Sequence, residues 1–284
     1  MKPVRVDWPG GSRCAVVVTI DFDAESDAIR EYRDKPVPIS RGQYGARVGL
    51  RRIVDLLHSL DIRATFFVPG WVAEHHTALL FDLKGKGHEI SSHGYLHEKL
   101  NEVSVDEERR VLERSISAIE KVTGDRPRGY RAPWGALSSH SLRLIRECGF
   151  EYDSSLMTQE LPFKIDFLDG KGTIVEVPWD WMVHDWPLYE EQGKGQREVF
   201  DIWMAEFEGL YGEGTVFRLL LHPRCSGRPS RVAVLERLLT HIRRKRDVWF
   251  ATAGELASFS STSEGFPTYS IEELLPEPPA SVAS

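Results

Sequence analysis

Short apolar runs rich in β-branched residues alternate with longer amphipathic stretches along almost the whole chain, and this alternation restricts the possible folds more than any other feature. The run CAVVVTI at 14–20 is continuously apolar, which is typical of a strand buried on both faces of a sheet. The stretch that follows Ser104 opens with the capping box SVDE and ends at Gly124, as expected for a helix. Further strand-like runs lie at 63–68, 88–91, 128–131, 150–155, 172–179, 215–221 and 248–252.

About seven or eight strands interleaved with helices predict an α/β fold with a largely parallel sheet. A closed or nearly closed barrel fits this pattern, and a doubly wound open sheet is the alternative. Residues 1–258 are expected to form this barrel as one domain. The Ser/Pro-rich segment 259–284 is expected to be a C-terminal extension that contacts a neighbouring subunit or is disordered.

The overall composition argues against several classes of partner. The 284 residues include 36 basic and 43 acidic side chains, for a net charge of −7, which disfavours nucleic acid or an anionic membrane as the main partner. The N-terminal residues lack the apolar core of a signal peptide, and the apolar runs are too short to span a bilayer. Cys14, Cys148 and Cys225 show no pairing pattern. A cytoplasmic setting is therefore expected.

Polar residues of unusual type gather where the predicted strands end. In a parallel barrel the carboxyl ends of the strands share one rim, and active sites are built on that rim. The sequence therefore predicts a functional site formed by residues that lie far apart along the chain. These residues are Asp21, Asp23, His93, His97, Arg131, Asp153 and His222.

Two pairs among these residues, Asp21 with Asp23 and His93 with His97, suggest a metal site, although each pair has an ordinary explanation as well. Asp21 and Asp23 would point to the same side of an extended chain, roughly 6–7 Å apart, or they could be loop or helix-capping residues. His93 and His97 would share one face if their loop turns helical, but ten histidines are present and several look like surface residues. Together with Asp23 they form a set of two imidazoles and one carboxylate, which suits Zn²⁺, Co²⁺, Ni²⁺, Mn²⁺ or Fe²⁺.

The remaining rim residues suggest proton transfer and charge pairing. His222 ends an apolar strand, where a histidine is more often an ordinary core or loop residue, and Asp153 is the expected partner that would hold its tautomer. Arg131 would be costly to bury unpaired, and a carboxylate such as Asp21 would resolve that cost.

Taken together, five motifs resemble those of the polysaccharide deacetylase family, the NodB-homology proteins of carbohydrate esterase type. The resemblance is strongest to the branch with peptidoglycan-deacetylase-like, allantoinase-like and cyclic imide hydrolase proteins, and it covers roughly residues 14–256. The motifs are TIDFDAES, SHGYLHE, RAPWG, YDSS and LLLHP. The resemblance implies a distorted (β/α)7 barrel that holds a divalent metal, with Zn²⁺ as the first expectation, on Asp23, His93 and His97.

The same resemblance implies roles for the other rim residues. Asp21 would act as general base, with Arg131 as its tether. His222 would act as general acid, steadied by Asp153. The backbone N–H of Trp134 would help to hold the oxyanion.

These observations lead to the expectation of a metal-dependent hydrolase that cleaves non-peptide C–N bonds. The expected substrate is a short N-acetylated sugar, or alternatively a small cyclic imide or ureide whose ring is opened. A non-catalytic binding protein that keeps the fold and a non-hydrolytic Fe²⁺ enzyme remain open. The aromatic residues of 177–189 could line a pocket or form core or subunit contacts. The resemblance and this segment suggest a homo-oligomer, a dimer or a tetramer.

Overall fold

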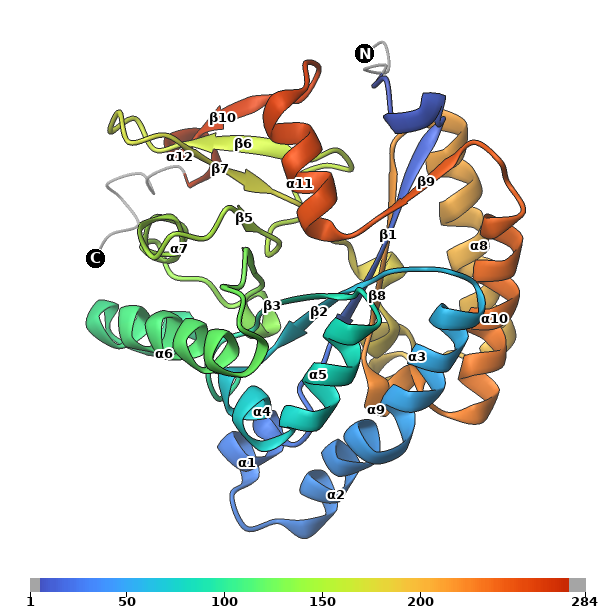
Figure 1. The fold of residues 1–284 in the computed structure, drawn as a ribbon, viewed down its shortest axis with the longest axis horizontal. Helices are drawn as coiled ribbons and strands as arrows, with labels where there is room; N and C mark the ends of the chain where they lie inside the picture. Colours follow the sequence, from blue (N-terminus) through green and yellow to red (C-terminus); the bar gives the residue numbers. More distant parts are fainter. Residues whose placement is uncertain (1–5, 276–284) are drawn as a thin grey trace.

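A single mixed sheet of ten strands forms the centre of the computed structural model, which describes residues 6–275 (Figure 1). The strand order is β10-β6-β7-β5-β4-β3-β2-β1-β8, and β9 also pairs with β1. Only β6 and β7 run antiparallel among the paired strands described. The bounds are β1 (Cys14–Asp21), β2 (Thr65–Val68), β3 (Glu89–Ser92), β4 (Gly129–Tyr130), β5 (Tyr152–Asp153), β6 (Phe163–Asp166), β7 (Thr173–Glu176), β8 (Val216–Leu221), β9 (Val248–Ala251) and β10 (Thr268–Ser270).

Strand β1 is fully buried and organises the sheet. It pairs with β8 from Ala15 to Ile20, and its other edge pairs first with β9 and then with β2. Beyond β8, a single parallel bridge from Leu220 to His184 continues the sheet. Within residues 6–275 the hydrogen-bonded ladder does not close completely, so the barrel is distorted. The predicted α/β fold with a largely parallel sheet is confirmed.

Helices cover the outside of the sheet, with α3, α8 and α10 on one side and α4, α5 and α6 on another (Figure 1). Helix α6 begins where predicted, since the Ser104 hydroxyl accepts a hydrogen bond from the Glu107 N–H, and it ends at Gly124, whose φ is 76°. The bounds are α1 (Ser26–Tyr32), α2 (Pro36–Tyr44), α3 (Leu50–Ser59), α4 (Gly70–His75), α5 (Thr77–Gly85), α6 (Val105–Thr123), α7 (Ser141–Glu147), α8 (Gln196–Glu213), α9 (Pro223–Ser226), α10 (Pro229–Arg243), α11 (Ala253–Thr262) and α12 (Ile271–Leu274).

The predicted domain boundary at residue 258 is not seen in the structure, because that residue lies inside α11. Strand β10, in the expected extension, pairs with β6, so the chain up to Ser270 contributes to the same sheet. The prediction also missed β6, whose FKID alternation buries Phe163 and Ile165. Residues 276–284, where disorder or a subunit contact was expected, lie outside the described residues. From Val6 to Leu275, no helix has both the length and the hydropathy needed to cross a membrane.

Candidate active site

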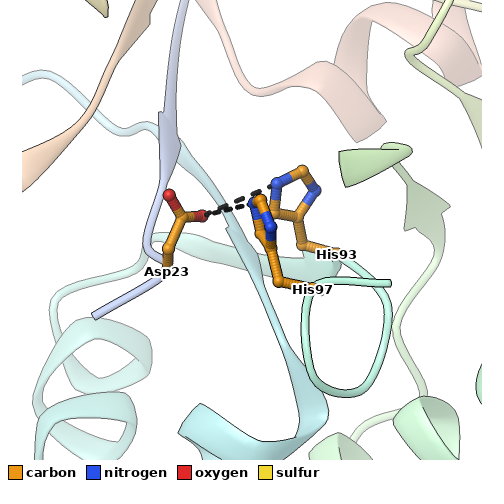
Figure 2. Close-up of side chains that lie close together, drawn as sticks. All are labelled: Asp23, His93 and His97. Carbon is orange, nitrogen blue, oxygen red and sulfur yellow. Dashed lines mark ion pairs between the residues drawn. The ribbon is translucent and has the colours of Figure 1, made fainter. Parts of the chain in front are cut away.

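Three side chains from the ends of β1 and β3 converge on one point at the carboxyl rim of the sheet (Figure 2). Asp23 lies two residues beyond β1, and His93 and His97 follow β3. Oδ1 of Asp23 lies 3.6 Å from Nε2 of His93 and 3.6 Å from Nε2 of His97. All three residues are buried, and their potential ligand atoms lie within 4.8 Å of one another.

The loop after β3 aims the two imidazoles without the helical turn that was expected. Gly94 and His97 both have positive φ, 72° and 59°, and the Glu98 carboxylate accepts hydrogen bonds from the Tyr95 and Leu96 N–H groups. The His93 and His97 rings therefore meet edge to face, 5.0 Å apart. Nδ1 of His93 lies 2.7 Å from the Arg131 carbonyl oxygen. Because a carbonyl only accepts, Nδ1 carries the proton and the lone pair of Nε2 faces Asp23.

The chemistry of these donors fits a divalent cation. Within the described residues, neither carboxylate oxygen of Asp23 receives a hydrogen bond. Burial raises the pKa of Asp23, and burial together with His93 lowers the pKa of His97 well below its usual value. A buried carboxylate without hydrogen bonds is costly, whereas a carboxylate and two neutral imidazoles are ordinary ligands for Zn²⁺ and similar ions.

Arg131 holds Asp21 beside this group. Nη1 of Arg131 donates to Oδ1 of Asp21 over 2.8 Å and to the Thr19 hydroxyl over 3.0 Å, while Nη2 and Nε reach the Ser154 hydroxyl and carbonyl. Burial by itself would raise the pKa of Asp21, but Arg131 and the nearby histidines lower it to about 2. Asp21 is therefore ionised, and its second oxygen, Oδ2, lies 3.8 Å from Nε2 of His93.

Asp185 holds His222, and this corrects the expected pairing with Asp153. One oxygen of Asp185 lies 2.8 Å from Nδ1 of His222, and the other accepts from the His222 backbone N–H and from the Ser226 hydroxyl. Burial would lower the pKa of His222, but Asp185 raises it. Nε2 of His222 lies 3.8 Å from Oδ2 of Asp23, so the free nitrogen faces the candidate metal site.

Asp153 instead belongs to a buried network beneath the Arg131–Trp134 segment. It lies opposite Glu176 across the parallel β5–β7 pair and accepts hydrogen bonds from the Ser155 N–H and hydroxyl. The Ser155 hydroxyl in turn accepts from the Ala132 N–H over 2.9 Å. Asp153 lies at a strand end, as predicted, but its neighbours are Ser155 and Glu176 and not His222.

A pocket opens beside the Asp23–His93–His97 cluster, Asp21 with Arg131, and His222. Trp134, which follows the RAP segment, has a φ of 61°, is 49% exposed as a residue and lines the pocket. The 177–189 segment contributes Trp179, Trp181 and Trp186, so its aromatic residues line the pocket, and Trp179 is also part of the core. Other lining residues that sequence reasoning missed are His184, Glu191 and Arg224. Asp185 was missed too, although it stands within this aromatic segment.

Arg224, from α9, extends the charge network on the other side of Asp23. One of its terminal nitrogens lies 3.3 Å from Oδ2 of Asp23 and the other pairs with Asp27. Its guanidinium lies over the Trp186 ring, 4.6 Å from the centroid. Asp21, Asp23 and Asp185 thus each have a basic neighbour.

Comparisons with known proteins agree with this arrangement. The family model described as polysaccharide deacetylase matches residues 42–152. A peptidoglycan deacetylase from Helicobacter pylori is 29% identical over 276 residues, covering 85% of this chain and 94% of that protein. A crystal structure of a polysaccharide deacetylase from Mycobacterium smegmatis, whose activity is assigned only provisionally, is 36% identical, with a TM-score of 0.84 and coverage of 91% and 93%. An allantoinase crystal structure is 26% identical, with a TM-score of 0.84 and coverage of 90% and 93%.

Proposed function

We propose that this chain, which belongs to the polysaccharide deacetylase family, is a metal-dependent hydrolase. It would cleave a non-peptide C–N bond by the attack of water on an amide carbonyl. The observation that carries the proposal is the convergence of three groups on one pocket: the Asp23–His93–His97 cluster, Asp21 held by Arg131, and His222 held by Asp185. Hydrolysis of an amide requires that water is activated, that a proton is accepted from it and that a proton is returned to the departing nitrogen. The three groups would serve these three purposes.

Asp23, His93 and His97 would hold the divalent ion, with Zn²⁺ as the first choice and Co²⁺, Ni²⁺, Mn²⁺ or Fe²⁺ as alternatives. When bound, the ion would supply Lewis-acid activation of water and of the substrate carbonyl. The backbone N–H of Trp134 is assigned to the oxyanion that develops on that carbonyl. The positive φ of this residue, in a turn at the pocket wall, supports the assignment.

Asp21 would accept the proton of the attacking water. Arg131 keeps this carboxylate ionised and fixed in direction. A carboxylate whose pKa is about 2 is a weak base, so its effect would come from its position next to the water and not from its basicity.

His222 would donate a proton to the departing nitrogen. Asp185 binds Nδ1 and raises the pKa of the ring, which favours the imidazolium at neutral pH. The free Nε2 faces the candidate metal site, where the scissile bond would lie. The acid and the base thus come from the ends of two adjacent strands, β8 and β1.

A short N-acetylated sugar is the first substrate class, in keeping with the peptidoglycan deacetylase relative. A second candidate is the ring opening of a small cyclic imide or ureide. The aromatic rings of Trp134, Trp179, Trp181 and Trp186 around the pocket, together with the likeness to an allantoinase structure, favour it. Release assays with N-acetyl sugars, chitin oligomers, succinimide and allantoin, run with and without chelator, distinguish the two.

His93→Ala is expected to lose bound metal and activity together, because the change removes one of three ligands. Metal per chain is measured by mass spectrometry and turnover by product release, with turnover expected to fall by about 10²-fold or more. The control is His75→Ala, which removes an exposed imidazole at the end of α4 and should change neither quantity. A His93→Ala protein with full metal content and normal turnover would contradict the assignment. Absence of any bound divalent metal from the unaltered protein would favour a non-catalytic binding protein.

A further inference from the structure

His184 is a buried histidine of the pocket that the proposed chemistry does not use. It is 8% exposed and lines the pocket together with Asp21, His222 and Arg131. Neither of its ring nitrogens has a hydrogen-bond partner among the described residues. An unpaired polar atom costs about 1–3 kcal/mol when buried, so such atoms are normally satisfied by a partner or a ligand.

Aromatic rings, not hydrogen bonds, fix the position of the His184 ring. The ring stacks on His222, with centroids 5.1 Å apart and planes at 20°, and on Trp181, with centroids 5.7 Å apart and planes at 19°. Trp179 packs against it edge to face at 5.3 Å. The parallel bridge to Leu220 holds its backbone beside β8. Because rings occupy its stacking positions, a ligand in the pocket would meet His184 at the edge that carries Nδ1 and Nε2, and both nitrogens are shielded from solvent in this structure.

The charges around His184 indicate what kind of group this edge would bind. Burial and the adjacent His222 lower the pKa of His184 to about 3, so the ring is neutral and presents one N–H donor and one acceptor. His222, Arg131 and Arg224 line the same pocket together with Asp21, Asp23 and Glu191, so the lining carries both signs of charge and favours neither an anion nor a cation beside His184. The matching ligand is an uncharged group with both a donor and an acceptor.

We propose that His184 is a specificity-determining residue that hydrogen-bonds an uncharged polar group of the substrate beside the scissile amide. Such a group is a hydroxyl in an N-acetylated sugar or the second N–H or C=O in a cyclic imide or ureide. This inference rests on the proposed function, since it places the group in the same pocket.

A second metal site is the competing explanation, because His184, Asp185 and His222 also lie close enough to share an ion. The oxygens of Asp185 are already engaged by His222 and by the Ser226 hydroxyl, and Nδ1 of His222 is bound to Asp185. Asp185 is therefore occupied, and the remaining nitrogen of His222, Nε2, faces Asp23, which favours a substrate contact of His184 over a second ion.

The test measures binding apart from turnover. The parent protein is metal-loaded Asp21→Asn, which removes the base and keeps an oxygen acceptor for Arg131. Calorimetry measures its affinity for a chitin trimer in one arm and for succinimide and allantoin in the other. His184→Phe in this background keeps an aromatic ring without either nitrogen and is expected to weaken binding of one class about 5- to 100-fold. His184→Gln, which keeps a donor and an acceptor, should restore part of the affinity.

Two controls make the result specific. His75→Phe in the same background should leave affinity unchanged, because His75 lies outside the pocket on α4. Metal content should stay at one ion per chain in every variant. Any of three results would overturn the inference. These are unchanged affinity in His184→Phe, no binding of either substrate class by the parent, and a metal content that falls from two ions per chain in the parent to one in the variant. Binding that depends on His184 in a protein that hydrolyses none of these substrates would remove the proposed function and leave the inference standing.

Discussion

At the scale of single residues, the partner of His222 decides at which pH this side chain carries its proton. Asp185 raises the pKa of His222 through an ion pair and a 2.8 Å hydrogen bond. A general acid works only while protonated, so activity is expected to fall as the pH rises through the pKa of His222. The raised pKa moves that fall to higher pH.

Asp185→Asn removes the charge that raises the pKa of His222. We expect turnover near neutral pH to fall by about 10²- to 10⁴-fold and the alkaline limb of the pH–rate profile to move to lower pH. Asp153→Asn is the matched control, because Asp153 contacts Ser155 and Glu176 and should leave the position of that limb unchanged. An alkaline limb that moves in the control and not in Asp185→Asn would restore the pairing expected from the sequence.

Glu176 gives a second prediction at this scale, which concerns stability. Burial and the adjacent Asp153 raise its pKa well above the ordinary value of 4.5. Between the two pKa values the folded protein therefore keeps a proton on Glu176 that the unfolded chain releases. The contribution of Glu176 to stability is complete below about pH 4.5 and is lost as the pH rises through its pKa in the folded protein. The loss amounts to at most about 1.4 kcal/mol per pH unit.

Glu176→Gln should abolish this pH dependence, because glutamine does not titrate and can still accept the Leu156 N–H bond. Urea unfolding of both proteins across a pH series checks the slope, and the variant is expected to be the more stable above about pH 7. A slope that is the same in both proteins would show that Glu176 does not hold the proton.

At the scale of elements, close backbone contact between two short segments places His222. The π-helical turn η2 (Gly45–Gly49) packs on α9, which begins immediately after His222. A Cβ at Gly49 would collide with the Pro223 carbonyl, and one at Gly227 would collide with Gly49. Glycine is needed here for the approach of two backbones and not for unusual dihedral angles.

Gly49→Ala is therefore expected to destabilise the fold by about 1–3 kcal/mol, the cost of overpacking, and to shift the start of α9. Gly209→Ala in α8 is the control, since a Cβ there meets nothing within 4 Å. It should stabilise the protein by about 0.5–1 kcal/mol, because alanine is the better helix former. Thermal unfolding of the two variants provides the comparison. Equal effects in both would contradict the packing argument.

At the scale of the whole molecule, the segment before β1 meets β9 and the segment around α11 in one aromatic cluster. Trp8 packs against Trp249, Phe259 and Phe266, with ring centroids 5.6–6.1 Å apart. The Trp8 indole N–H also donates to the Gly214 carbonyl. This cluster ties the segment after α11 to the start of β1, so the C-terminal part completes the same core.

Trp8→Ala is expected to destabilise the protein by about 3–5 kcal/mol, because it removes a buried indole that packs against Trp249, Phe259 and Phe266. Phe81→Ala, at a side chain that is 58% exposed on α5, should stay within about 0.5 kcal/mol of the parent. Urea unfolding measures both. A loss in Trp8→Ala no larger than in Phe81→Ala would mean that the cluster contributes little. The expected dimer or tetramer stays a prediction, which light scattering would check.

The sequence by itself determined the strands that carry the site and most of the residues at their ends. Continuous apolar runs predict buried strands, and in a parallel sheet the strand ends share a rim, so Asp21, Asp23, His93, Arg131 and His222 could be placed together. Capping signals likewise located α6. These inferences succeed because periodicity and capping depend on residues that are neighbours along the chain.

Only the tertiary structure decided which side chains pair. Asp185 lies 37 residues before His222, and Asp153 meets Glu176 because β5 lies beside β7. No local sequence pattern encodes either pair. The same holds for β6 with β10, and for the place of the His184 side chain between aromatic rings. Hydrogen bonds and ring contacts require positions within a few ångströms, and only the packing of distant segments sets such positions.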